Sequence, residues 1–417
     1  MANSLITPSV IAKEALMQLK NNLRFGKLAY KEYKKEFAKV GDTVSIRKPV
    51  KFYTADGAVR VNQDVEEGKT SVKIDQRKHV SWGFSTNDLT LTIEEYSARY
   101  IKPAMITLAQ TVDAQGAALY KTLWNSVGTP GTTPANYAAV GAVSQRATEM
   151  AIPDQDRKGV LTPAAFQTIA ATLTTLNMPQ MAMSAWSSGE IGNLAGFETL
   201  QSVNLKNHIV GTKAGTPLIN GAAQNVTYQS NVAALGGAVK DVGGQTLLTK
   251  GWTASSAVLK NGDVFTIAGV FAVNPVPGEG TTGKTVMSYL QQFVVTEDIS
   301  ADGTGNATVK ISPAIITTGP YQTVSAAPAD NAVITVMGSA GIAYPQNMFF
   351  HPNTFGLVTV PLELPDGAAF KSRESEDGLS VRVVKDYDIT NDLDIIRVDI
   401  MFGWKTLYPD LGVRLWG

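Results

Sequence analysis

The sequence contains no cysteine and only three histidines. The absence of cysteine excludes disulfide bonds, a thiol nucleophile and any metal site built from thiolates. The histidines are His79, His208 and His351. They are far apart, and none has a His or Cys neighbour at metal-ligand spacing, so we predict a structural role for each. The chain also lacks an apolar run of about 18 residues, which argues against a membrane-spanning helix.

Charged residues are scarce as well. They make up 17% of the chain, whereas about a quarter is usual, and the formal net charge is zero. Because near-zero net charge favours association, a chain of this kind is expected to bury surface against partners. The lack of a basic excess argues against a free-standing nucleic-acid-binding protein. The first residues show no secretory signal pattern, so we expect synthesis in the cytoplasm.

The charges are unevenly distributed along the chain. Residues 1–51 contain eleven Lys or Arg and four acids, whereas residues 361–417 contain eleven acids and seven Lys or Arg. The basic head and the acidic tail can attract each other between copies of the chain, or they can be two separate solvated faces.

The first residues predict a helix followed by an extended hairpin. Thr7-Pro8 is a typical helix start, and apolar residues recur at helical spacing over 11–23. Residues 41–84 then contain two strand-like runs, DTVSIRKPVKFY and KTSVKIDQRKHVSWGF, around a polar, turn-rich middle. This hairpin has too few large apolar residues to bury itself. It therefore either lies on a neighbouring molecule or is a mobile surface hairpin.

The next segment predicts one long helix. Thr92 can cap its start, Glu94 suits the first turn, and apolar residues recur at spacings of three and four over 101–123. A helix from there to about Ser126 would be roughly 50 Å long. Pro103 falls inside it and is expected to bend it. We interpret the apolar stripe as core.

The rest of the chain predicts an α+β fold with an inserted β-module. Residues 128–225 mix helix and strand, and a helix restarts at Thr162-Pro163. Over 226–345 short strand-like runs alternate with Gly, Pro, Asn and Asp, as in a small barrel or sandwich. Residues 346–417 return to mixed structure, with two strands joined by a turn at 390–392 and a final strand.

One stretch matches a nucleotide-binding motif. Residues 278–285, GEGTTGKT, fit G-x-x-x-x-G-K-[ST], in which Lys284 would reach phosphates and Thr285 would hold magnesium. A true phosphate loop lies between a parallel strand and a long helix, whereas strand-like runs with tight turns surround this one. The following VMSYLQQFVVTED fits a helix and a strand equally well. We favour a Gly-rich connection between two barrel strands, with a P-loop NTPase as the alternative.

No other motif predicts chemistry. The acids Asp386, Asp388, Asp392 and Asp394 lack the Gly and the terminal Glu of a calcium loop, so we interpret them as a turn with solvated side chains. No G-x-S-x-G nucleophile elbow occurs. We predict no catalytic residue, cofactor or metal, and we do not expect an enzyme.

Four segments resemble one family of proteins. KNGDVFTIAGVFAVNPVPGEGTTGKTVMSYLQQFVVTED is similar to the inserted β-domain of tailed-bacteriophage major capsid proteins, in the group typified by the coat protein of the short-tailed Salmonella phage. GLSVRVVKDYDITNDLDIIRVDIMFGWKTLYPDLGVRLWG resembles the C-terminal signature of that group. ISPAIITTGPYQTVSAAPADNAVITVMG and FFHPNTFGLVTVPLELP also fit, and the order of the upstream segments agrees.

The resemblance implies the Hong Kong phage capsid fold with an inserted β-barrel. Its expected parts are an N-terminal arm (1–40), an extended loop (41–84), the spine helix of the peripheral domain (85–127), the first part of the peripheral and axial domains (128–225), the inserted β-barrel (226–345) and the return strands (346–417).

The resemblance also implies a function. Copies of the chain would assemble with a scaffolding protein, in the host bacterial cytoplasm, into a procapsid of hexamers and pentamers that becomes part of the virion. A portal complex would occupy one vertex, DNA would lie on the inner face, and the shell would expand as DNA is packaged. Decoration proteins are a further expected partner class. A β-rich virion decoration or surface protein is the alternative to a shell subunit.

Charged residues on two projecting segments are the predicted subunit contacts. They are Arg47, Lys48, Arg60, Glu66, Glu67 and Lys69 on the hairpin, and Lys240 and Asp241 in the Gly-rich stretch 234–244. The stretch 234–244 either contacts the next capsomer or is a floppy exposed loop. Pro103 is the predicted hinge of the spine helix during expansion. No Lys–Asn cross-link is predicted, because no catalytic Glu can be identified.

Overall fold

The computed structural model describes residues 8–31, 43–55, 57–63, 68–85, 97–173, 192–228, 238–239, 243–276, 284–368, 370–389 and 393–417. The chain forms two compact units, each built from separate stretches of sequence. Unit 1 contains residues 1–45, 71–117 and 355–406, and unit 2 contains residues 46–70, 118–354 and 407–417. The polypeptide therefore leaves unit 1 and returns to it twice.

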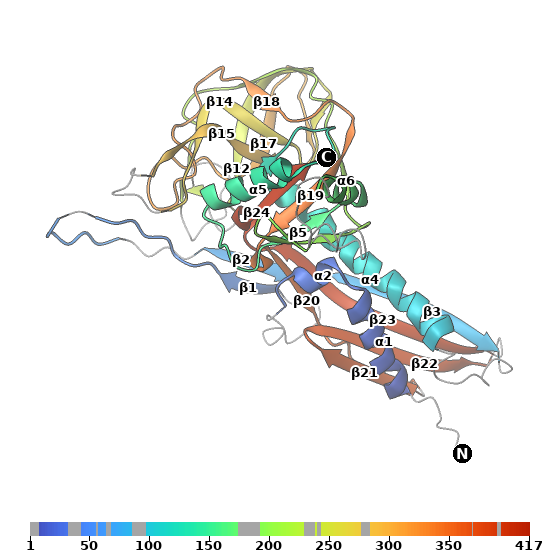
Figure 1. Ribbon diagram of the computed structural model, residues 1–417. Coiled ribbons are helices and arrows are strands. Elements are labelled where there is room, and N and C mark those ends of the chain that lie inside the picture. The colour runs from blue at the N-terminus through green and yellow to red at the C-terminus, as the bar shows by residue number, and fades with distance from the viewer. Residues whose placement is uncertain are drawn as a thin grey trace. The chain divides into compact units, whose positions relative to one another are not determined.

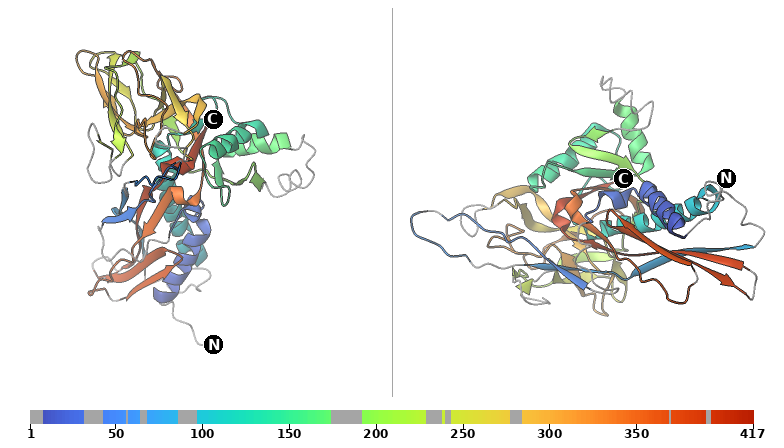
Figure 2. Two further views of the ribbon diagram at one scale, coloured as in Figure 1. Left: turned by 90° about the vertical axis from the view of Figure 1, so that its left-hand side faces the viewer. Right: turned by 90° about the horizontal axis from the view of Figure 1, so that it is seen from below.

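Unit 1 is an antiparallel sheet with helices on one face (Figure 2). Its strands are β3 (Gln76–Ser85), β20 (Phe355–Thr359), β21 (Phe370–Glu376), β22 (Leu379–Asp388) and β23 (Leu393–Thr406). Their order is β20-β23-β22-β21, and β3 also pairs with β23. The helical segments are α1 (Pro8–Asn22), α2 (Phe25–Leu28), the π-helical turn η3 (Ser97–Ile101) and α4 (Lys102–Ala117).

Helix α1 is part of the core of unit 1. Ile11, Leu16 and Leu19 are buried, as the apolar spacing predicted. The helix packs against α4 and against strands β21 and β22 (Figure 1). The predicted N-terminal helix is confirmed from Pro8 onward, and it is packed on the sheet of its own chain.

The predicted long helix is shorter and irregular. Its described part begins with the π-helical turn η3, continues as α4 and ends in a 3-10 turn, η4 (Ala118–Thr122). It does not reach Ser126, because Ser126 and Val127 form strand β4, which pairs with β24. The predicted cap at Thr92 and Glu94 lie outside the described residues.

The predicted hairpin at 41–84 also differs from the structure. Strands β1 (Thr43–Arg47) and β2 (Lys69–Lys73) do form a two-stranded sheet. The second strand-like run, however, is divided, and its larger part is β3, which pairs with β23 from Ser85↔Leu393 to Gln76↔Phe402. Local sequence patterns carry no information about a partner so far along the chain, which is why the sequence did not reveal this pairing.

Unit 2 contains a seven-stranded mixed sheet. Its order is β4-β24-β19-β5-β7-β6, and β8 pairs with β19. The strands are β4 (Ser126–Val127), β5 (Lys158–Leu161), β6 (Asn193–Leu194), β7 (Phe197–Gln201), β8 (Asn207–Ile209), β19 (Ala343–Phe350) and β24 (Gly412–Trp416). Helix α5 (Tyr137–Glu149) packs on β4 and β24, and α6 (Pro163–Leu173) packs on α5. The helix predicted at Thr162-Pro163 and the final strand are confirmed.

The second large sheet of unit 2 is a nearly closed barrel. Its order is β18-β14-β15-β17-β12-β9, and a bridge between Leu218 and Val333 joins the two edges. The strands are β9 (Gly215–Ile219), β12 (Gln245–Trp252), β14 (Val264–Val273), β15 (Val286–Val295), β17 (Ala307–Ser312) and β18 (Ile334–Val336). Because β9 belongs to this sheet, its first strand lies ahead of the start predicted at residue 226.

Shorter elements complete unit 2. They are the parallel pair β10 (Thr227–Tyr228) and β11 (Ala238–Val239), the antiparallel pair β13 (Ala257–Leu259) and β16 (Ile299–Ser300), and the 3-10 turns η5 (Pro352–Thr354) and η6 (Pro409–Leu411). One apolar cluster includes residues of both the barrel and the seven-stranded sheet. Within that sheet the rings of Phe197 and Phe349 pack edge to face, with 5.1 Å between ring centres. Among the described residues no helix is long and apolar enough to cross a membrane.

Candidate assembly surfaces

A long loop joins β1 and β2 and exposes apolar side chains. Figure 1 shows it running outward from these strands as a narrow arm. Phe52, Val59 and Val61 are exposed, and Val59 is 81% exposed. Solvent contact of this kind is unfavourable for apolar groups, at about 25 cal/mol per Å². Burial of these three side chains against another molecule would therefore be favourable.

The arm is held at two levels by polar contacts. Near its middle the side chain of Gln63 bridges to the opposite branch: its Oε1 accepts from the Tyr53 N–H at 3.0 Å and its Nε2 donates to the Tyr53 carbonyl at 2.6 Å. Near its base the Lys48 N–H donates to the Gly68 carbonyl at 2.7 Å. The two branches are thus tied together without a continuous strand ladder.

A tyrosine pair supports the base of the arm. The Lys51 N–H donates to the Tyr321 hydroxyl at 3.3 Å, and the Lys51 ammonium lies 6.0 Å from the centre of the same ring. Tyr321 stacks on Tyr228 with 3.7 Å between ring centres. Sequence reasoning missed Tyr321, because GPYQTV carries no pattern that distinguishes a supporting aromatic from an ordinary loop residue.

Lys284 holds the neighbours of Tyr321 in place. Its ammonium donates to the carbonyls of Pro320 at 2.9 Å and Gln322 at 3.0 Å, on either side of that tyrosine. The side chain is buried, and burial, followed by the positive charge of Lys51, lowers the pKa of Lys284 to about 8. This lysine therefore fixes the strip of backbone on which the arm rests.

These contacts argue against a nucleotide-binding role for the GEGTTGKT motif. Residues 277–283 lie outside the described part of the chain, but both flanking elements are described. Strand β14 precedes the motif and β15 follows it, and the two pair antiparallel. A phosphate loop needs a helix after its Lys and Thr, whose dipole and free N–H groups bind phosphate. Here a strand follows Thr285, so the hairpin interpretation is confirmed and the NTPase alternative is not favoured.

The predicted contact residues fall into three groups. Arg60 is exposed on the arm, and Lys48 is half-buried at its base. Arg47 and Lys69 belong to β1 and β2, but their side chains are outside the described part of the structure. Glu66, Glu67, Lys240 and Asp241 also lie outside the described residues.

Pro103 marks a change of helix type. It is the second residue of α4, the helix that follows directly on the π-helical turn η3. Proline has no N–H to donate, and its ring clashes with the carbonyl four residues earlier. The residue four positions earlier, Arg99, lies in the π-helical turn, so the irregularity coincides with the place where a proline disturbs a regular α-helix.

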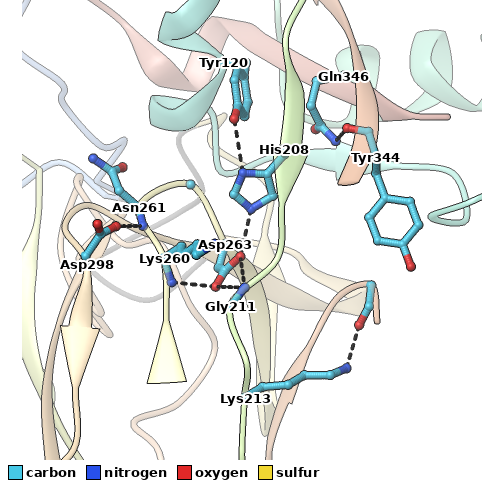
Figure 3. Close-up of polar contacts among 12 residues, drawn as sticks. Tyr120, His208, Gly211, Lys213, Lys260, Asn261, Asp263, Asp298, Tyr344 and Gln346 are labelled. Atoms are coloured by element: carbon cyan, nitrogen blue, oxygen red, sulfur yellow. Dashed lines mark hydrogen bonds and ion pairs between the residues drawn. The ribbon is translucent and has the colours of Figure 1, made fainter. Parts of the chain in front are cut away.

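A buried polar network lies in unit 2 around His208 (Figure 3). The Nε2 of His208 is 2.7 Å from Asp263 Oδ1, and its Nδ1 is 3.1 Å from the Tyr120 hydroxyl. Since a carboxylate only accepts, Nε2–H donates to Asp263 and Nδ1 accepts from Tyr120. Burial lowers the pKa of His208, so the neutral ring fits both bonds.

The same carboxylate organises the turn before β14. Asp263 also accepts the N–H groups of Lys260 at 2.8 Å and Gly211 at 3.1 Å (Figure 3). Beside it, the fully buried Arg414 donates to the Gly262 carbonyl at 2.8 Å. The network thus joins η4, β8, the β13–β14 turn and β24. Among the described residues no group of His, Cys, Asp and Glu is placed to hold a metal ion.

One family model matches the whole chain, and one curated relative covers most of it. The family model described as "P22 coat protein - gene protein 5" matches residues 1–417. The "Major capsid protein" of Acyrthosiphon pisum secondary endosymbiont phage 1 is 24% identical over 397 residues, which cover 90% of this chain and 89% of that protein.

Two solved structures are similar at low identity. The structure titled "Mycobacterium phage Che8" is 13% identical, with a TM-score of 0.45, over 94% of this chain and 90% of that one. The capsid of cyanophage P-SCSP1u is also 13% identical, with a TM-score of 0.39, over 91% and 84% of the two chains.

Proposed function

Since the chain belongs to the P22 coat protein family and is a phage major capsid protein, we propose that it reaches the icosahedral head shell through a scaffold-assisted procapsid that expands as DNA is packaged. The observation that carries the proposal is the family match over the whole chain. Hexamers and pentamers would form in the host bacterial cytoplasm and become part of the virion.

We further propose the Hong Kong phage capsid fold for this chain. Support comes from a helix of changing type at 97–122, from the sheet against which it packs, and from the nearly closed barrel inserted between β8 and β19. The ranges assigned above then give the arm (1–40), extended loop (41–84), spine (85–127), first domain part (128–225), inserted barrel (226–345) and return strands (346–417). Pro103 would be the hinge at which the spine changes its bend.

The proposed mechanism is non-covalent self-assembly. The exposed arm between β1 and β2 would lie on a neighbouring subunit and bury Phe52, Val59 and Val61 there. Each such contact can be weak, because many copies repeat it in a closed shell. The charged residues of the arm, including Arg47, Lys48, Arg60, Glu66, Glu67 and Lys69, and the pair Lys240 and Asp241, would select the partner surface.

The direct test is microscopy of the purified protein. With its scaffolding protein, wild-type chain should give closed shells in negative stain. A decoration protein would instead remain monomeric or trimeric beside preformed shells. A sample that stays monomeric at high concentration, with and without scaffold, would contradict the proposed function.

We propose that the basic N-terminal segment faces the interior, where scaffold, portal and DNA are located. Lys13, Arg24 and Lys27 are exposed on α1, next to α2 and on α2. Removal of residues 1–40 is a poor test, because it would also remove buried residues of α1 from unit 1. The triple change of these three residues to Gln is preferable. It should reduce scaffold uptake while the subunit stays folded, and unchanged uptake would refute the proposed orientation.

A further inference from the structure

A buried carboxylate on the sheet of unit 1 is surrounded by three arginines. Asp399 of β23 has no exposed surface. Its Oδ2 accepts from Nε of Arg382 at 3.2 Å and from Nη2 of the same residue at 2.5 Å. Its Oδ1 accepts from Nε of Arg397 at 2.8 Å and lies 3.7 Å from Nη2 of Arg77. One negative charge therefore faces three positive charges.

Two of these arginines have donors left over. The side chains of Arg77 and Arg397 are 46% and 38% exposed, whereas that of Arg382 is 11% exposed. Among the described residues Asp399 is the only acid in ion-pair contact with Arg77 or Arg397. A guanidinium has five N–H donors in a planar fork that fits a carboxylate or a phosphate. The cluster therefore offers an anion-binding position already fixed by a buried acid.

The cluster lies on the face of the sheet away from the helices. Asp399 alternates along β23 with the buried Val398 and Ile400, and α1 and α4 pack on the other face (Figure 2). Strand register places Arg382 directly beside Asp399 on β22 and His79 directly beside it on β3. The three arginines thus come from three adjacent strands, and their geometry is set by the sheet.

Neighbouring acids restrict the kind of anion. The carbonyl of Glu363 accepts from Arg382 Nη1 at 2.7 Å, so this exposed acid borders the cluster on one side. Asp386, also exposed, lies on β22 four residues beyond Arg382 and therefore on the same face. A nucleic-acid backbone, with a charge at every phosphate, would meet these acids as well as the arginines. A single carboxylate would meet the arginines alone.

We propose that Arg77 and Arg397 bind a carboxylate side chain of a second copy of this chain, and that this contact helps to hold neighbouring subunits together. The inference rests on the proposed shell assembly. It adds a specific site on unit 1 that recognises an acidic group on the neighbour. With equal numbers of acids and bases, the chain can supply that group itself.

The test uses the full-length protein and its scaffold. In the double variant Arg77→Gln and Arg397→Gln, both exposed forks are lost while Arg382 still neutralises Asp399. The matched control is Arg373→Gln. It removes one arginine directly beside Arg382 on the edge strand β21, where Arg373 is bonded to the Leu362 carbonyl and not to Asp399. Light scattering gives the lowest concentration at which shells form.

The double variant should raise that concentration at least about tenfold, because charge-assisted bidentate bonds are lost. The control should stay near wild type. Wild-type assembly should also weaken between about 0.05 and 0.5 M salt, and the double variant should respond less, since salt screens exposed charges.

Other outcomes would overturn the inference. If the double variant forms shells at the wild-type concentration with the same salt response, the site is not an assembly contact. If it assembles normally but loses affinity for a short DNA duplex, the partner is nucleic acid. If the glutamine variant does not fold, the double variant Arg77→Lys and Arg397→Lys is used instead. It keeps both positive charges but loses the planar pair of N–H donors that a guanidinium presents to a carboxylate. An unchanged assembly concentration for that variant also refutes the proposal. Absence of shells from wild-type protein would instead overturn the proposed function.

Discussion

Gly116 of α4 lies against two aromatic rings of unit 1. A Cβ at this position would be 2.6 Å from Phe25 Cδ1 and 2.6 Å from Trp404 Cζ2. The Trp404 ring cannot easily withdraw, because its Nε1 donates to the Val112 carbonyl at 3.0 Å. The glycine is therefore required by packing, even though it lies inside a helix.

Gly116→Ala should lower the free energy of unfolding of the subunit by about 1–3 kcal/mol through overpacking. Gly141→Ala on α5 is the matched control, since its new Cβ would meet only Tyr137 at 3.8 Å. The control should gain about 0.5–1 kcal/mol from helix propensity. Urea unfolding of both variants checks the prediction, and a stabilised Gly116→Ala protein would contradict it.

His208 makes stability depend on pH. Burial holds the pKa of the folded-state ring below its ordinary value, so the unfolded chain takes up a proton first as the pH falls. The contribution is fully present above the unfolded pKa of about 6.5 and is lost as the pH falls below it.

Between pH 7.5 and 5.5 the wild type should therefore lose more stability than His208→Gln, by up to about 1.4 kcal/mol per unit of pKa difference. Gln110→Ala on α4, an exposed change of a side chain that does not titrate, serves as the control. Denaturant unfolding at both pH values measures the difference. Equal losses in wild type and His208→Gln would show that the network does not titrate in this range.

At the scale of elements, Pro103 lies where the helix over 97–122 changes type. The π-helical turn Ser97–Ile101 ends two residues before Pro103, which has no N–H to donate and whose ring fixes its φ angle. An alanine at this position would restore the N–H and permit an ordinary α-helix through the turn.

Pro103→Ala should stabilise the subunit, by up to about 3 kcal/mol. If the turn is the hinge of expansion, the variant procapsid should also expand at a higher temperature than wild type. Gln110→Ala, an exposed change on the same helix, should leave expansion unaffected. Gel mobility of heated procapsids reports expansion, and identical transition temperatures for Pro103→Ala and wild type would exclude a hinge at this residue.

Helices and strands that begin with a capping pair or show regular apolar spacing can be predicted from the sequence. The strands with which they pair cannot. The starts of α1 and α6 follow from Thr-Pro pairs, and β22 and β23 follow from their apolar alternation. The pairing of β3 with β23 depends on residues at opposite ends of the chain, so no local pattern encodes it.

The same limitation applies to the sites. The arm between β1 and β2 was identified because its apolar content is too low for a core of its own. The Asp399 cluster was missed, because the three arginines meet only once the strand order is known. Lys284 was assigned to a connection between strands, but its bonds to the carbonyls near Tyr321 had no sequence signal.

For the molecule as a whole, assembly should change the accessibility of the arm. Residues 57–62 are all exposed in the isolated chain, including Arg60 in their middle. Trypsin should therefore cleave the free subunit after Arg60 and should leave assembled shells intact at that bond. Mass spectrometry of the fragments measures both. Equal cleavage rates in subunit and shell would mean that the arm does not lie on a neighbour.

Because the two units interleave along the chain, they cannot finish folding at the same time during synthesis. Most of unit 2 lies within one continuous stretch, 118–354, whereas unit 1 needs α1 from the beginning and β21 to β23 from near the end. While the ribosome makes the intervening residues, α1 has no sheet to pack on. The face that is buried in the folded subunit is therefore exposed to solvent. Pairing across such long sequence distances is slow. Unit 1 should therefore become protected from hydrogen exchange only after translation has passed Thr406, later than the barrel. In a nascent chain stalled before β21, the barrel should be folded and protected from exchange, whereas α1 should be unprotected.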